Sequence, residues 1–375
     1  MAIVSTKKNW INLTIWVVII ALIIAAPTFL PVFRLNLLGR YLSLAIVALG
    51  VDLIWGFTGM LSLGQGIFFA LGGYCAAMFL QLNSSEGFPN GIPEFFGLYG
   101  IEKLPFFWEP FRSSIFTLFS IWLLPAIIAG LLGYLVFRNR IKGVYFSILT
   151  QAALLVFFNF FNGQQKLING TNGLKTDVTE LFGQMVGSEI MQRWFFWLTA
   201  ILVIFAWLFS RWIVRDRFGD ILIGIRDDEP RVRFTGYNPV VFKTIIFSIA
   251  GGLAGISGAL YTVQSGIVSP QFMTVPFSIE MVIWVAVGGR GTLLGAILGA
   301  VFINYAKSLV SEALPASWMF IQGGLFIFVV TALPEGVLGW IRRGGLKELL
   351  YLMGINKKLK TYPKLEVNEQ GEVKS

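Results

Sequence analysis

The sequence predicts an all-α polytopic membrane protein with about ten transmembrane helices, some of them broken or re-entrant. Of its 375 residues, 56% are hydrophobic and only 13% are charged, and the mean hydropathy is +0.74. A soluble domain is nearer half apolar and a quarter charged. The apolar residues form runs close to the roughly 20 that a spanning helix needs, and basic residues gather at the ends of these runs. Lipid is therefore the expected solvent of most of the surface.

The apolar runs divide the chain into a membrane domain with short polar ends. We expect a cytoplasmic N-terminus over residues 1–14, a membrane domain over 15–343 and a charged cytoplasmic tail over 344–375. The candidate segments are 15–33, 40–57, 62–82, 115–137, 143–161, 194–214, 244–264, 278–288, 292–307 and 318–340.

The distribution of charge predicts the orientation. Lys7 and Lys8 precede the first segment, and basic residues follow segments 115–137 and 194–214, whereas the polar stretch 83–112 is acidic. Positive charge marks the cytoplasmic side, so both termini are expected inside. The alternative for the first segment is a cleaved signal peptide.

Several function classes are excluded by composition. The chain has no histidine and one cysteine, Cys75, so Ser-His-Asp catalysis, Cys-His pairs and histidine-ligated metals are ruled out, and no metal site is expected. There is no P-loop motif, so any ATPase must be another chain. The net charge of +9 is explained by basic residues at the ends of apolar segments, which orient the chain in the membrane. No nucleic acid is therefore expected as a partner.

Two glycine-rich segments, 59–73 and 288–299, interrupt the two halves of the chain. The second includes Gly-Gly-Arg-Gly at 288–291, so 278–288 and 292–307 are each short for a span and form either two short helices or a re-entrant pair. Interrupted helices at corresponding places often flank a transport path.

The basic loop 215–243 contains signals for two short helices. The first is expected over 217–225. Asp228 or Glu229 can cap the second, Pro230 suits its first turn, and Gly236 suits its end. Such a loop either fits a groove on a partner protein or is simply solvated.

Four polar residues within or beside apolar runs are candidates for the translocation path. Glu280 and Arg290 either line or gate the path or reach the membrane surface from segment ends. Gln65 and Gln151 offer both donors and acceptors to a polar solute, or bond neighbouring helices.

Residues 42–343 resemble the permease subunits of ABC importers for branched-chain amino acids and urea. Residues 59–66 (GMLSLGQG) and 70–74 (ALGGY) are similar to a signature of that family, and 217–219, 225–227 and Gly236 resemble its cytoplasmic coupling loop. The resemblance implies that this loop docks onto an ATPase. The residues that would couple are Arg217, Gly219, Arg226, Asp228, Glu229, Arg231, Arg233 and Gly236.

Stretches 140–148, 231–239 and 278–293 resemble the urea-type branch of the family. The resemblance therefore implies import of urea by alternating access across the inner membrane. It also implies a second homologous permease, two cytoplasmic ATPase subunits that bind ATP and magnesium, and an external solute-binding protein. The same machine could carry branched-chain amino acids or short amides. A stand-alone channel or an ion-coupled carrier using Asp52 and Glu280, and a membrane enzyme, are the alternatives from other classes.

Overall fold

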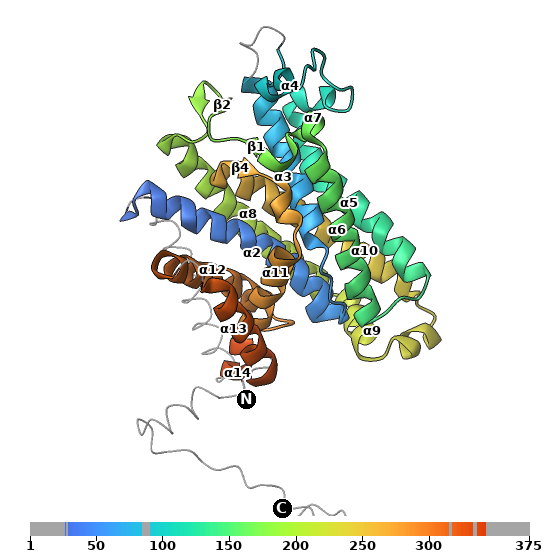
Figure 1. Cartoon of the computed structure of the whole chain (residues 1–375). Coiled ribbons are helices and arrows are strands. Elements are labelled where there is room, and N and C mark those ends of the chain that lie inside the picture. Colours follow the sequence, from blue (N-terminus) through green and yellow to red (C-terminus); the bar gives the residue numbers. More distant parts are fainter. Residues whose placement is uncertain (1–26, 28, 85–90, 315–316, 333–335, 343–375) are drawn as a thin grey trace, which may run out of the picture.

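The computed structural model describes residues 27, 29–84, 91–314, 317–332 and 336–342, and most of these are helical (Figure 1). Within these ranges, seven helices are long and apolar enough to cross a membrane. They are α2 (Val32–Thr58), α3 (Gln65–Ser84), α5 (Ser114–Arg138), α6 (Val144–Gly163), α8 (Glu189–Arg215), α10 (Pro239–Ser265) and α12 (Leu293–Ala313). The prediction of a polytopic α-helical membrane protein is confirmed.

The remaining predicted segments differ in length from the expectation. Segment 15–33 lies largely outside the described residues. The helix α11 (Val275–Gly288) has 14 residues and α13 (Trp318–Ala332) has 15, which at 1.5 Å per residue is less than the roughly 30 Å of a hydrocarbon core. The expectation that 292–307 is too short to span was wrong, because α12 continues to Ala313 and has 21 residues. A short helix, α14 (Gly336–Arg342), follows α13.

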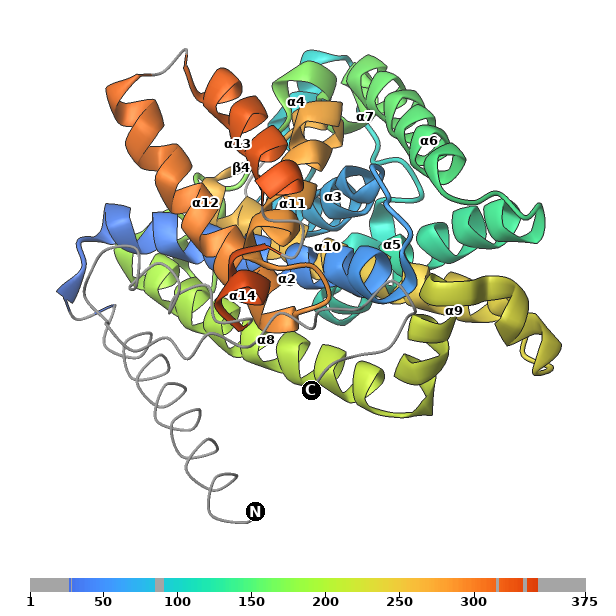
Figure 2. The same ribbon diagram turned by 90° about the horizontal axis from the view of Figure 1, so that it is seen from below.

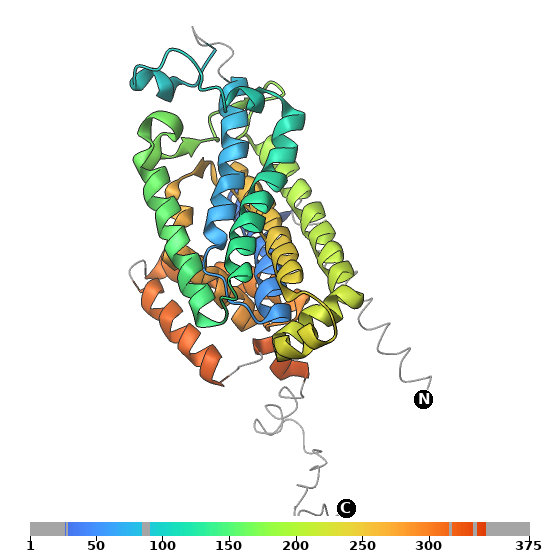
Figure 3. The same cartoon turned by 90° about the vertical axis from the view of Figure 1, so that its right-hand side faces the viewer.

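The centre of the molecule is formed by α2, α3 and α10. In their most apolar stretches, α2 is 83% buried and α3 is 89% buried, whereas α6 is 17% buried. The helix α10 packs against α5, α3 and α2, and Figure 3 shows α6 and α8 on opposite flanks of this centre. The exposed sides of α5, α6 and α8 are rich in large apolar residues, which suits contact with lipid.

Glycines allow the central helices to approach closely. A Cβ at Gly258 of α10 would lie 1.8 Å from the Phe69 carbonyl oxygen of α3, and one at Gly72 of α3 would lie 2.0 Å from the Gly255 oxygen. A Cβ at Gly299 of α12 would similarly lie 2.0 Å from the Trp284 oxygen of α11. Lipid offers no hydrophobic drive for helix association, so such backbone contact is a main source of packing energy.

The longer connections gather at one end of the bundle. They contain α4 (Glu94–Leu98), η2 (Glu109–Arg112), α7 (Gln165–Ile168), η3 (Gly170–Asn172), β1 (Leu174–Lys175), β2 (Glu180–Leu181), β3 (Gln184–Met185), β4 (Ile267–Val268) and η4 (Pro270–Met273). Strand β1 pairs antiparallel with β4, with Leu174 opposite Val268, and β2 pairs antiparallel with β3. The helix α9 (Arg217–Phe234) lies at the other end of the molecule (Figure 1).

Candidate coupling loop and transport path

The helix α9 joins two long helices almost directly. Asp216 alone separates it from α8, and residues 235–238 separate it from α10. The predicted loop 215–243 is therefore shorter than expected, because Arg215 ends α8 and Lys243 lies inside α10. Figure 2 shows α9 projecting beyond the packed helices. A force on α9 acts on both neighbouring helices.

A kink divides α9 into the two helices that the sequence predicts. Asp228 has non-helical angles (φ −156°, ψ 88°), and its Oδ1 accepts a hydrogen bond from the Arg231 N–H at 3.2 Å. Pro230 lies in the first turn after the kink. Gly236, with φ +89°, follows the last helical turn, where a positive φ favours glycine. Of the two predicted capping residues, Asp228 is the one that caps the helix, and the predicted stop at Gly236 is confirmed.

Replacing Asp228 with alanine is expected to loosen the second half of α9. The substitution removes the acceptor for the Arg231 N–H and costs about 1 kcal/mol, or about a fivefold increase in amide exchange over residues 229–234. Hydrogen–deuterium exchange measures this. Asp228→Asn keeps a capping oxygen and should exchange as the wild type does; equal loosening in both variants would contradict the role of the cap.

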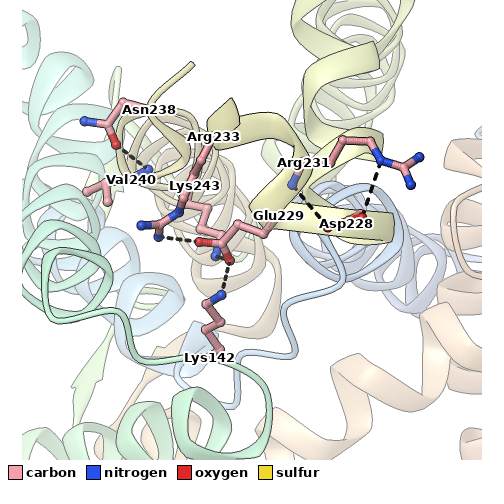
Figure 4. Close-up of polar contacts among 8 residues, drawn as sticks. All are labelled: Lys142, Asp228, Glu229, Arg231, Arg233, Asn238, Val240 and Lys243. Carbon is pink, nitrogen blue, oxygen red and sulfur yellow. Dashed lines mark hydrogen bonds and ion pairs between the residues drawn. The ribbon is translucent and has the colours of Figure 1, made fainter. Parts of the chain in front are cut away.

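A buried cluster of charges holds this second half against the rest of the chain (Figure 4). The Glu229 carboxylate accepts hydrogen bonds from Arg233 and from Lys243 of α10, each at 2.7 Å. Lys142, in the turn between α5 and α6, lies 3.3 Å from the same carboxylate. Glu229 is 9% exposed and the Lys243 side chain is 7% exposed. Three segments distant in sequence therefore meet at one carboxylate.

The electrostatics of Glu229 favour its charged form. Burial raises the pKa of this carboxyl, but hydrogen bonds from Lys243 and Arg233 and the positive charges of Lys243 and Lys142 lower it more, so the pKa falls to about 2. The carboxylate is therefore ionised at physiological pH.

Apart from Asp228, which caps the second half of α9, the predicted coupling residues separate into an outward-facing and an inward-facing group. Arg217, Arg231 and Gly236 are exposed, and the Arg231 side chain is 83% exposed. Phe234, which is 92% exposed, adds a large apolar side chain to this surface. These residues are available to another protein.

The inward-facing group instead contacts the chain itself. Besides Glu229 and Arg233, it contains Gly219, where a Cβ would lie 2.2 Å from the Val214 oxygen of α8. Arg226 is partly exposed, with 35% of its side chain accessible, but its Nη1 donates to the Gly56 oxygen of α2 at 2.9 Å.

A cavity of ≈340 Å³ lies beside α9. Its lining includes Met60, from the link between α2 and α3, together with Lys142, Arg226 and Lys243. The helix therefore has open space on one side.

The four candidate path residues lie in different environments. Gln65, at the start of α3, is 1% exposed, and neither its amide oxygen nor its nitrogen has a partner among the described residues. The Ser278 hydroxyl of α11 is also buried without a described partner; the sequence analysis did not single it out. Gln151 is half-buried in α6.

Glu280 and Arg290 have separate partners. The Lys307 ammonium of α12 donates to both Glu280 oxygens, at 2.7 and 2.8 Å. Arg290, in the turn between α11 and α12, donates through Nε to the Trp55 oxygen at 3.1 Å, and its guanidinium lies 4.9 Å from the centre of the Trp55 ring. Sequence reasoning missed Lys307, although a lysine at the end of an apolar segment was a signal that it could have used.

Comparisons with known proteins agree with this architecture. Residues 33–330 match the model of a family described as the permease component of branched-chain amino acid transport systems. The high-affinity branched-chain amino acid transport system permease protein LivM of Salmonella typhimurium is 26% identical over 318 residues, covering 79% of this chain and 68% of the relative. LivM of Escherichia coli K12 is 27% identical over 319 residues, with the same coverage.

A further relative matches a smaller part of the chain. The autoinducer 2 import system permease protein LsrC of Salmonella choleraesuis is 31% identical over 144 residues, which are 36% of this chain and 40% of the relative. No solved structure matches the chain. Because the family model covers most of the sequence and the fold is polytopic and helical, the chain belongs to the family of permease components of branched-chain amino acid transport systems.

Proposed function

We propose that this chain is the channel-forming subunit of an ATP-driven importer of branched-chain amino acids in the inner membrane. Permeases of this family are not enzymes, and ATP hydrolysis takes place in separate ATPase subunits. The proposed complex contains a second homologous permease, two cytoplasmic ATPases that bind ATP and magnesium, and an external solute-binding protein. The exposed surface of α9 is the main observation that supports docking to ATPases, and the two LivM relatives support the cargo.

The shape of α9 suits a docking element. Arg231 and Phe234 extend from its second half, and an exposed arginine beside an exposed aromatic is typical of residues that anchor protein interfaces. The carboxylate of Glu229 fixes the same half to α10 and to the turn between α5 and α6. Movement of the ATPases would therefore be passed to several spanning helices, as alternating access requires.

Urea is a second candidate cargo. Gln65 presents a buried amide with both its donor and its acceptor free of described partners, and urea is a small neutral amide that needs both. Stretch 278–293, which resembles the urea-type branch, includes the buried Ser278 hydroxyl. Both LivM relatives are named for transport of branched-chain amino acids and neither for transport of urea, so the urea interpretation takes second place.

The test is uptake of radiolabelled leucine and urea, measured in parallel in cells that lack the gene. Leucine uptake is expected to be lost and to return with the wild-type gene. Arg231→Glu, which reverses an exposed charge on α9, should leave uptake at least about tenfold lower, because an arginine anchor contributes ~1.4 kcal/mol or more to an interface. Lys103→Glu, which reverses an exposed charge in the connection between α4 and η2 at the other end of the molecule, is the control and should restore uptake.

Each outcome separates the candidates. Loss of urea uptake alone would show that the cargo is urea and not leucine. Unchanged uptake of both solutes would overturn both cargo proposals. Full uptake with Arg231→Glu would contradict docking through α9, whichever solute is carried.

A further inference from the structure

The last turn of α2 binds two arginines from different parts of the chain. Arg226 of α9 donates to the Gly56 oxygen at 2.9 Å, and Arg290, from the turn between α11 and α12, donates to the Trp55 oxygen at 3.1 Å. The last carbonyl groups of a helix carry partial negative charge and lack partners within it; of the two here, the Trp55 oxygen also accepts from the Gly59 N–H, directly after α2, at 3.1 Å. The last turn of α2 has no basic residue of its own, so these two arginines supply the positive charge that it favours.

A third contact fixes the turn between α11 and α12 to α2. The Gly291 N–H donates to the Asp52 carboxylate at 2.7 Å. Asp52 is fully buried, and its second oxygen has no partner among the described residues. A Cβ at Gly56 would lie 2.5 Å from the Gly291 nitrogen, so the absence of a side chain at Gly56 permits this approach.

The two arginines influence each other. Arg290 lies within electrostatic range of both Arg226, which repels it, and Asp52, which attracts it. A Cβ added at Gly59, directly after α2, would lie 3.0 Å from the Arg226 Cγ, so the arginine side chain passes close to the end of α2. A displacement of α9 that moves Arg226 would thus change the forces on the turn between α11 and α12, although α9 is not bonded to that turn directly.

We infer that the last turn of α2 transmits movement of α9 to the turn between α11 and α12, with Arg226, Arg290 and Asp52 as positioning residues. This inference rests on the proposed function of α9 as the docking element. The cavity beside Arg226 gives α9 space to move. Coupling then passes through one defined set of hydrogen bonds and not only through the chain connection from α9 to α8 and α10.

The test is cysteine labelling that does not depend on the cargo. Thr292→Cys places a thiol at the half-buried end of the turn, in a Cys75→Ala background, and the chain is purified with its ATPase and permease partners. Trapping with ATP and vanadate is expected to change the rate of maleimide labelling by about fivefold, which is a typical coupling between two sites. Adding Arg226→Met should abolish this change while ATP hydrolysis persists, because methionine keeps the packing but not the donor. Arg226→Lys should restore it, and Arg211→Met on α8 should leave it intact.

The results distinguish this inference from the proposed function. If no ATPase co-purifies with the unaltered chain, the proposed function fails, and the inference fails with it. ATPases could co-purify while the labelling rate at residue 292 does not change with nucleotide, or changes equally in Arg226→Met. Either result would contradict transmission through α2 and leave docking through α9 in place. If Arg226→Met prevents ATPase association, Arg226 serves docking and not transmission.

Discussion

Glu229→Gln is expected to abolish transport and to destabilise the chain. The substitution removes the negative charge shared by Lys142, Arg233 and Lys243. Lys243 is then left 7% exposed beside two further cations, and breaking a buried pair by removing one partner costs on the order of 3 kcal/mol or more. The second half of α9 should detach from α10, which would disorder the surface on which Arg231 and Phe234 lie.

The measurements are uptake in cells and the thermal midpoint of the purified chain in detergent. Glu189→Gln is the matched control, because it breaks an ion pair with Arg193 in which both side chains are about half exposed, and exposed pairs contribute little. A Glu229→Gln midpoint equal to that of the control would contradict the structural role of the cluster.

The stability of the wild type and that of Glu229→Gln are expected to depend differently on pH. The pKa of Glu229 is lowered from its ordinary value of 4.5 to about 2, so its contribution to stability is fully present above the ordinary pKa and is lost as pH falls from about 4.5 towards 2. The wild type should therefore lose part of its stability over that range of pH. Glu229→Gln should lack this part, since glutamine does not titrate.

Features governed by neighbours in sequence were predictable. The kink of α9 follows from a capping residue, a proline suited to a first turn and a later glycine, and each signal acts within a few residues of Asp228. The breaks at 59–64 and 289–292 follow from glycines that interrupt apolar runs. Such local preferences are set by backbone geometry, so sequence alone reveals them.

The partners of the charged residues were not predictable in this way. Glu229 and Arg233 were expected to face another protein, but in the structure Glu229 pairs with Lys243 of α10, and Arg233 pairs with Glu229. Glu280 pairs with Lys307, 27 positions away, and Asp52 accepts from Gly291, 239 positions away. These pairings depend on how the helices pack, and no periodicity along one segment encodes them. The length of α11 was also hidden, because hydropathy records apolar composition and not the turn at which a helix ends.

Gly258→Ala is expected to prevent stable packing of α3 against α10. The added Cβ would lie 1.8 Å from the Phe69 carbonyl oxygen, and this neighbour is backbone in the middle of a helix, so it cannot rotate away. The helices must separate, which also weakens the neighbouring contact of Gly72 with Gly255. Overpacking of a core costs about 1–3 kcal/mol and occasionally more; the upper end is expected here, because both central helices lose contact. The thermal midpoint and the yield of monodisperse protein in detergent measure the effect.

Gly324→Ala provides the matched control for this prediction. Gly324 lies in α13, and no described atom lies within 4 Å of its Cβ position. Alanine favours a helix over glycine by about 1 kcal/mol, so this control should be as stable as the wild type or slightly more stable, and Gly258→Ala gains the same preference. A large fall in the thermal midpoint of Gly258→Ala alone would therefore be caused by the contact between the backbones of α3 and α10. Equal thermal midpoints of the two variants would mean that these helices do not pack through their glycines.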